Sequence, residues 1–133
     1  MAVEPNGTAP LLNEGNIVGA RQVVRHLTQQ LKFSLVDQTK MITAASELAR
    51  NTLDYAGGGN VDIEIINGPR RGVRLTFEDH GPGIKDIDAA MRDGFTTGNG
   101  LGLGLGGAKR LCSEFSIHSV PGEGTRVTCS RWK

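Results

Sequence analysis

Glu47 and Asn51 carry a carboxylate and an amide, two groups that can accept a proton or bind a cation. They stand four residues apart in a segment with helical periodicity, so both project from one face of that helix. A carboxylate in this place can accept a proton, and an amide oxygen is a neutral ligand for a hard cation such as Mg²⁺. The same spacing is common on solvated helix surfaces. By itself it indicates a candidate base and a candidate cation ligand, with a solvated surface as the alternative.

Asp79 is a second candidate, in residues 78–84, directly after an alternating apolar segment. Where a strand ends and the backbone turns sharply, a carboxylate can accept a hydrogen bond from a ligand N–H. Asp in such a turn also commonly accepts from its own backbone. The local sequence favours this second, structural interpretation.

Glycine marks a third candidate, because seven of the chain's 19 glycines lie in residues 94–107. Alternating Gly and Leu ahead of a helix offer backbone N–H donors at a positive helix end, which suits a polyphosphate. No Gly-Lys-Ser/Thr follows, so this is not a P-loop, and no βαβ unit surrounds it as a dinucleotide fingerprint requires. A fourth element, residues 122–125, is explained by a hairpin turn alone.

Two amphipathic helices are expected to position the first candidates. Ile17, Ala20, Val24, Leu27 and Leu31 form one apolar stripe, with Asn16 as the predicted N-cap. Ser34 or Asp37 is predicted to cap a second helix, which runs to about Ala56 and ends at residues 57–59.

Alternating patterns predict strands in the rest of the chain. Residues 61–65 and 73–77 form a predicted hairpin, residues 84–93 hold a short helix, and residues 104–115 form another helix. Two final strands are predicted at residues 116–120 and 125–131. The pattern indicates an α+β two-layer sandwich. Residues 1–12 are expected to be a mobile tail before a single domain, residues 13–133.

Composition excludes several classes of protein. The 133 residues carry 15 Lys and Arg against 14 Asp and Glu, without the basic stripe of a nucleic-acid binder. No apolar run is long enough to span a membrane. Cys112 and Cys129 lack metal-ligand spacing, so reduced thiols and a cytoplasmic location are expected.

The four candidate elements, in this order, resemble the Bergerat-fold (GHKL) superfamily of ATPases and kinases. Its N-box looks like Glu47 with Asn51, its first glycine box like residues 79–83, its second like residues 100–107, and its late Gly-Thr element like residues 124–125. Within the superfamily, the chain is similar to small serine/threonine kinases that regulate sigma factors by partner switching, as in bacterial stressosomes. The resemblance implies a mostly antiparallel mixed sheet covered on one face by helices.

The resemblance also implies residue roles. Glu47 would be the general base of an ATP-dependent phosphoryl transfer, Asn51 would coordinate Mg²⁺, and Asp79 would accept from the adenine amino group. Residues 98–107 would form a short lid. The implied nucleotide contacts are Asn51, Asp79, Gly81, Gly83, Ile84, Gly98, Gly100, Leu101, Gly102, Leu103, Gly104, Leu105 and Thr125. No Lys or Arg lies between Gly94 and Ala108, so the phosphates would depend on Mg²⁺, backbone amides, or Lys109 and Arg110.

The partners implied by the resemblance are proteins. A STAS-domain antagonist would be the substrate, and the released kinase would activate a PPM-type phosphatase. The alternative is an anti-sigma factor that binds and sequesters a sigma factor directly. Neither nucleic acid nor a membrane is expected as a partner.

Overall fold

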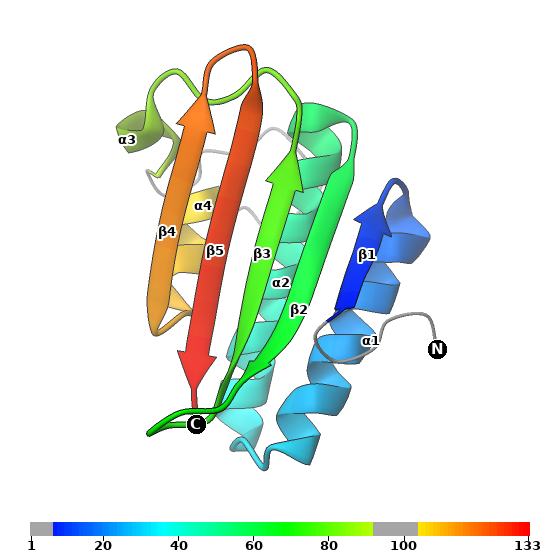
Figure 1. Ribbon diagram of the computed structural model, residues 1–133, viewed down its shortest axis with the longest axis vertical. Helices are drawn as coiled ribbons and strands as arrows, with labels where there is room; N and C mark the ends of the chain where they lie inside the picture. The colour runs from blue at the N-terminus through cyan, green and yellow to red at the C-terminus, as the bar shows by residue number, and fades with distance from the viewer. Residues whose placement is uncertain (1–6, 92–103) are drawn as a thin grey trace.

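The computed structural model of the protein describes residues 7–91 and 104–133. A five-stranded sheet carries its helices on one face, so that the molecule has two layers (Figure 1). The strands are β1 (Gly7–Leu11), β2 (Gly59–Ile66), β3 (Gly72–Asp79), β4 (Glu114–Val120) and β5 (Gly124–Trp132). The helices are α1 (Glu14–Gln30), α2 (Leu35–Ala56), α3 (Ile87–Ala90) and α4 (Gly104–Arg110).

The sheet has the strand order β1-β2-β3-β5-β4, and each neighbouring pair is antiparallel. The predicted α+β two-layer fold is confirmed, but the expectation of a mixed sheet is corrected for the described residues. β5 returns between β3 and β4 (Figure 1), so these two strands, which run in the same direction, do not pair with each other.

The predicted alternation of apolar residues places one face of the sheet against the helices. Val61 and Ile63 in β2, and Val73 and Leu75 in β3, are fully buried. They meet the buried stripes of α1 and α2 in one hydrophobic core. Burial of alternate residues on each strand leaves the opposite face of this antiparallel sheet to solvent, which is ordinary for the class.

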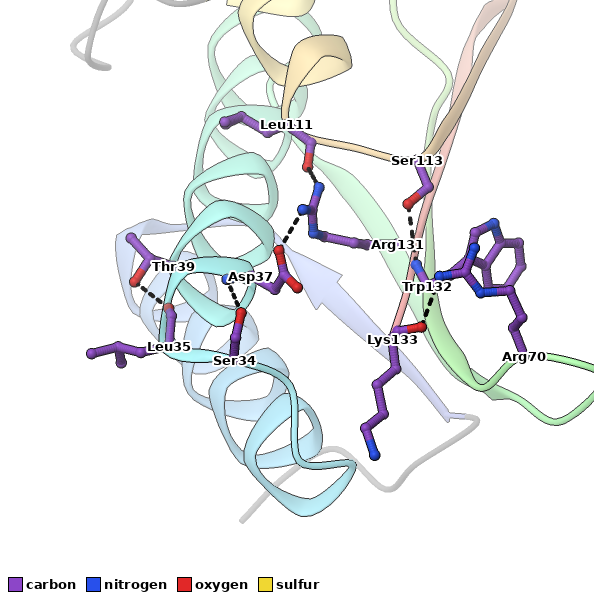
Figure 2. Close-up of polar contacts among 10 residues, drawn as sticks. All are labelled: Ser34, Leu35, Asp37, Thr39, Arg70, Leu111, Ser113, Arg131, Trp132 and Lys133. Atoms are coloured by element: carbon purple, nitrogen blue, oxygen red, sulfur yellow. Dashed lines mark hydrogen bonds and ion pairs between the residues drawn. The ribbon is translucent and has the colours of Figure 1, made fainter.

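The sequence predicted the N-cap of α2 correctly but not the N-cap of α1. Ser34 caps α2, its side chain accepting from the amide of Asp37 at 3.1 Å (Figure 2). For α1 the predicted cap Asn16 is wrong, because Asn13 caps this helix and accepts from the amide of Asn16 at 3.0 Å. Both asparagines suit a cap, and Asn16 instead accepts from the amide of Leu12 at 2.8 Å.

The expectation of a mobile tail over residues 1–12 is wrong for residues 7–11, which form β1. This strand pairs with β2, buries Ala9 and Leu11, and bonds the Thr8 hydroxyl to Asp62 Oδ1 at 2.6 Å. β1 lies at the edge of the sheet, where Pro10 is tolerated because no further strand needs its missing N–H. The composition of this segment is typical of a tail, but the burial of Ala9 and Leu11 stabilises it as a strand.

The last predicted helix is shorter than expected. α4 ends at Arg110 rather than near residue 115, and Phe115 belongs to β4. After the helix, the amide of Ser113 donates to the carbonyl of Ser130 at 2.8 Å, which brings the chain into the sheet. No helix among the described residues is long and apolar enough to cross a membrane.

Candidate active site

A cavity of about 450 Å³ lies between α2, the segment around α3, the first turn of α4 and the adjoining ends of β3 and β5. Predicted site residues from four separate parts of the chain line it: Asn51, Asp79, Gly83, Ile84, Leu105 and Thr125. A larger, shallow depression of about 730 Å³ lies on the solvent face of the sheet, and none of the predicted site residues lines it. The tertiary structure therefore brings most of the described candidates to one cavity.

Asp79 is the last residue of β3, and the strand register places it opposite Thr125 of β5. Its Oδ1 accepts from the amide of Gly81 at 2.9 Å and from the amide of Thr125 at 3.2 Å. The first bond is the turn-satisfying contact that the local sequence favoured. Both bonds use the same oxygen, so they hold the carboxylate in place and neither of them occupies Oδ2.

Gly83 and Gly124 each allow two backbone segments to approach closely near the cavity. Gly83 has φ of 76°, and a Cβ there would lie 2.5 Å from the carbonyl oxygen of Val120. Gly124 has φ of 135°, and a Cβ there would lie 2.1 Å from the carbonyl oxygen of Asp79. Only glycine satisfies both the positive φ and the close approach.

A hydroxyl pair fixes the wall of the cavity beside Asp79. Ser119 Oγ lies 2.8 Å from Thr125 Oγ1, accepts from the amide of Ile84 at 2.7 Å and donates to the carbonyl of Gly124 at 3.1 Å. The predicted residues Ile84 and Thr125 are thus joined through Ser119, which sequence reasoning missed. The available signal was its position on the inward-facing side of β4, where a polar residue needs partners.

Asn51 lies on α2 and lines the cavity, and its buried Nδ2 has no hydrogen-bond partner among the described residues. An unpaired amide in this position fits a ligand that completes its bonds, because buried polar groups are rarely left unsatisfied. Its amide oxygen is also a suitable donor for Mg²⁺, which typically uses few protein ligands together with substrate phosphates. The described residues contain no cluster of three or more His, Cys, Asp or Glu side chains that could hold a metal ion by themselves.

Glu47 lies one helical turn before Asn51 and is 5% exposed, but it is not among the residues that line the cavity. Its neighbour Arg50 forms an ion pair with Glu14 of α1, with Arg50 Nη2 and Glu14 Oε2 2.9 Å apart. This pair raises the pKa of Arg50 and lowers that of Glu14 through their hydrogen bond. It joins the two long helices beside the candidate base.

The second glycine box is only partly described. The predicted contacts Gly98, Gly100, Leu101, Gly102 and Leu103 lie outside the described residues. Gly104 and Leu105 form the first turn of α4 and are buried, and Leu105 lines the cavity. Gly81 does not line the cavity, but it donates its amide to Asp79.

Apolar side chains complete the cavity, and the sequence analysis did not assign them to it. Phe77 and Val127 come from the sheet, Ala90 from α3, and Tyr55 stands one turn after Asn51 with 41% exposure. The spacing of Tyr55 from Asn51 was a usable signal, because residues four apart share a helix face. An apolar cavity with a carboxylate acceptor on one wall and an unpaired amide on another suits a flat heterocycle joined to a polar, charged group.

The comparison with family models agrees with this geometry. Residues 36–133 match the family described as histidine kinase-, DNA gyrase B-, and HSP90-like ATPase. The match covers most of the chain, including α2 and every strand after β1. The chain belongs to this ATPase family, and ATP is the nucleotide that membership implies.

Named relatives define its place within the family more closely. The chain is 48% identical over 123 residues to the serine/threonine-protein kinase RsbT of Bacillus subtilis (strain 168), which covers 92% of each chain. It is 30% identical over 118 residues to an anti-sigma F factor of Thermoanaerobacter sp. (strain X514), covering 85% of this chain and 82% of that protein. It therefore groups with the serine/threonine kinases and anti-sigma factors of the family.

Solved structures share the fold at much lower identity. The sensor histidine kinase MprB, from a mycobacterium, superposes with a TM-score of 0.55 at 14% identity, covering 96% of this chain and 97% of that chain. Full-length ShkA, solved with AMPPNP, gives a TM-score of 0.56 at 18% identity. This match covers 98% of the present chain but only 32% of ShkA. These likenesses establish the Bergerat fold.

Proposed function

We propose that this protein is an ATP- and Mg²⁺-dependent serine/threonine protein kinase of a partner-switching pathway. The observation that carries the proposal is that Asn51 of α2 and Asp79 of β3 line one largely apolar cavity, with Glu47 one turn before Asn51 on the same helix. The 48% identity to RsbT over nearly the whole chain supports the same activity. An ATP-using kinase of this kind would act in the cytoplasm.

The cavity residues have distinct parts in nucleotide binding. Asp79 Oδ2 accepts from the exocyclic amino group of adenine, and Phe77, Val127 and Leu105 exclude water from the base. Asn51 is the protein ligand for Mg²⁺, which when bound would neutralise the charge that develops on the phosphates. Positioning and charge neutralisation are the main requirements of phosphoryl transfer.

Glu47 is the general base in this proposal. As the substrate Ser or Thr oxygen attacks the γ-phosphorus, the bond to the leaving ADP oxygen breaks and the hydroxyl proton passes to the Glu47 carboxylate. Its place one turn from Asn51 puts proton acceptor and cation ligand on one helix face. Its 5% exposure protects the carboxylate from bulk water.

The proposed substrate is a STAS-domain antagonist protein. Once released from that protein, the kinase would bind and activate a PPM-type phosphatase. The alternative is direct sequestration of a sigma factor, which the 30% identity to an anti-sigma F factor favours. We rank it second because the identity to the kinase is higher over a larger share of the chain.

Replacing Glu47 by Gln tests the catalytic assignment. Because Gln keeps the shape but cannot accept the proton, phosphate transfer from ATP to a STAS-domain protein of the source organism should fall by about 10²–10⁴-fold. The affinity for ATP, measured by calorimetry, should change by less than about threefold. Glu64→Gln, on the solvent face of β2, is the matched control and should behave as the unaltered protein. Transfer retained in Glu47→Gln would refute the role of Glu47 as base.

Capture of partners from the source organism separates the two functions. With ATP and Mg²⁺ present, recovery of a STAS-domain protein that becomes phosphorylated on Ser or Thr supports the kinase. Recovery of a PPM-type phosphatase whose activity rises on binding supports the released state. Recovery of a sigma factor, with no phosphorylated STAS-domain protein, supports the alternative.

A further inference from the structure

Cys112 and Cys129 lie outside the nucleotide cavity, and the proposed kinase reaction uses neither of them. Cys129 is on the inward face of β5 and is fully buried. Cys112 follows the end of α4, is half-buried and packs against the same hydrophobic core. Both are free thiols.

The segment that follows α4 is hydrogen-bonded to β5 next to Cys129. The thiol of Cys112 donates to the carbonyl of Ala108 in α4 at 3.2 Å, and Ala108 is fully buried. One residue later, the amide of Ser113 donates to the carbonyl of Ser130 at 2.8 Å. Phe115 then pairs directly with Cys129 in the sheet. These contacts hold Cys112 beside the strand that carries Cys129.

The two thiols interact, and their surroundings make them unequal. Hydrogen bonding from the Cys129 thiol lowers the pKa of Cys112, burial opposes this, and the nearby charge of Arg131 lowers it further. The pKa of Cys129 is well above its usual value because that same bond and its burial both favour the thiol. Arg131 is held in place by the carbonyl of Leu111 at 2.8 Å and by Asp37 (Figure 2).

We propose that Cys112 and Cys129 are a peroxide-oxidisable pair that closes a reversible disulfide between the end of α4 and β5. Cys112, partly accessible and beside a cation, is the attacking thiol. Cys129, buried against it, is the resolving thiol. A more acidic, accessible thiol next to a resolving cysteine is the usual arrangement of a redox-sensitive site.

The chemistry balances with hydrogen peroxide as the oxidant. The Cys112 thiolate attacks one peroxide oxygen, the O–O bond breaks, and Cys112 becomes a sulfenic acid while hydroxide leaves and is protonated to water. The Cys129 sulfur then attacks the Cys112 sulfur, the S–O bond breaks, and the Cys129 proton leaves with that oxygen as a second water. Two thiols lose two electrons and two protons in total, and hydrogen peroxide becomes two water molecules.

Because α4 begins at the nucleotide cavity, the disulfide would fix the far end of a helix whose first turn supplies Leu105 to that cavity. The proposal does not depend on nucleotide binding. Its test therefore needs neither ATP nor a partner protein.

The folded full-length chain is treated with hydrogen peroxide, quenched with catalase, unfolded and alkylated with iodoacetamide. We expect that most chains will take up no alkyl group and will be lighter by two hydrogen atoms, and that dithiothreitol will restore both alkylation sites. Trypsin cleaves after Arg110, Arg126 and Arg131, so the two cysteines fall in different peptides. The disulfide should appear as residues 111–126 joined to residues 127–131.

Two variants and one condition make the test specific. In Cys129→Ala, Cys112 should form a sulfenic acid that dimedone traps, whereas in Cys112→Ala the buried Cys129 should stay alkylatable. In urea the linked peptide should form more slowly than in the folded chain, since proximity is lost. Two alkylated thiols after peroxide treatment, a disulfide between two chains, or Cys112 oxidised to sulfinic acid beside a free Cys129 would each overturn the proposal.

Discussion

The Asp79 carboxylate has one structural role that the contacts show and a second, proposed role in binding adenine. Oδ1 accepts from the amides of Gly81 and Thr125 and so joins the end of β3 to the start of β5. Under the proposed function, Oδ2 would accept from the adenine amino group. The sequence indicated both a turn-forming Asp and a ligand-binding Asp, and the structure accommodates both.

Replacing Asp79 by Asn tests this division. Asn keeps an oxygen acceptor for the two amides but presents an NH₂ group where the adenine amino group needs an acceptor. The affinity for ATP should fall by at least about tenfold, because a hydrogen bond to a charged group contributes about 1.5–3 kcal/mol. Calorimetric titration with ATP measures the loss.

The neighbouring Glu78→Gln is the matched control for Asp79→Asn. Glu78 lies on the same strand with its side chain on the alternate face, and it does not line the cavity. Its ATP affinity should equal that of the unaltered protein. If both variants bind ATP normally, Asp79 does not contact the nucleotide.

Ser119 shows what sequence reasoning could not find at this scale. Its hydroxyl connects Ile84 to Thr125, two residues that were predicted individually. The three positions belong to β4, β5 and the segment after β3, so only the strand pairing brings them together. Its inward position in an alternating strand signals that this serine needs hydrogen-bond partners, but it does not identify them.

Among the elements, the turn between β4 and β5 contacts the segment after Asp79 that lines the cavity. The amide of Gly122 donates to the carbonyl of Pro82 at 2.7 Å, which ties the turn to the first glycine box. Gly122 and Gly124 both have positive φ, but only Gly124 is in close contact with β3. A comparison of substitutions at these two glycines therefore distinguishes the effect of backbone conformation from the effect of close packing.

Gly124→Ala should be more destabilising than Gly122→Ala. Each substitution forces a side chain into the left-handed region, which costs about 1 kcal/mol of unfolding free energy. At Gly124 the Cβ also meets the carbonyl of Asp79, so the total loss should exceed about 2 kcal/mol and ATP affinity should fall with it. Urea unfolding and ATP titration measure both effects. Equal losses in the two variants would show that the contact with β3 is unimportant.

The edge strand β1 offers a second test at the scale of elements, through two adjacent leucines. Leu11 is fully buried, whereas Leu12 is 64% exposed. Leu11→Ala should lower the free energy of unfolding by about 2–5 kcal/mol because it leaves a cavity in the core. Leu12→Ala should change it by less than about 0.5 kcal/mol. If both variants changed the free energy of unfolding equally and only slightly, the segment would not be a packed strand, and the predicted tail would be correct.

On the scale of the whole molecule, Arg131 joins three separate parts of the chain. From β5 it donates to the carbonyl of Leu111 after α4 at 2.8 Å and to Asp37 in the first turn of α2 at 2.5 Å (Figure 2). The Arg131 hydrogen bond holds the pKa of Asp37 below its usual value, against the opposing effect of burial. This network connects the first turn of α2 with the residue that follows α4, and none of its three residues lines the cavity.

The Asp37–Arg131 pair predicts a pH dependence of stability. Since the folded-state pKa of Asp37 is depressed, its contribution is complete above the unfolded value of about 3.9 and is lost as the pH falls through the lower folded value. Asp37→Asn should lower the free energy of unfolding by about 1 kcal/mol at pH 7, because a partly exposed ion pair contributes little more than this to stability. The gap from the unaltered protein should shrink below about pH 4.

Urea midpoints measured from pH 7 down to acid test this expectation. Asp54→Asn, at an exposed position near the other end of α2, is the control and should shift stability by less than about 0.5 kcal/mol. A gap between Asp37→Asn and the unaltered protein that stays constant into acid would mean that charge is not what stabilises this contact.

Local sequence was sufficient to predict most of the helices and strands and the spacing of one candidate pair. The period of two in β2 and β3, the helical stripes of α1 and α2, the Ser34 cap and the shared face of Glu47 and Asn51 all depend on residues a few positions apart. Such interactions form within one element, so their patterns are visible without the fold. The ordered glycine boxes added the family resemblance, which the comparisons confirmed.

Only the tertiary structure decided how these parts meet. It made a strand of residues 7–11, ended α4 at Arg110, placed β5 between β3 and β4, and brought Cys112 beside Cys129. Each result depends on contacts between residues far apart in the chain, such as Asp79 with Thr125 across β3 and β5. Such contacts are selected by burial and by backbone pairing in the assembled core, so no window of sequence contains them.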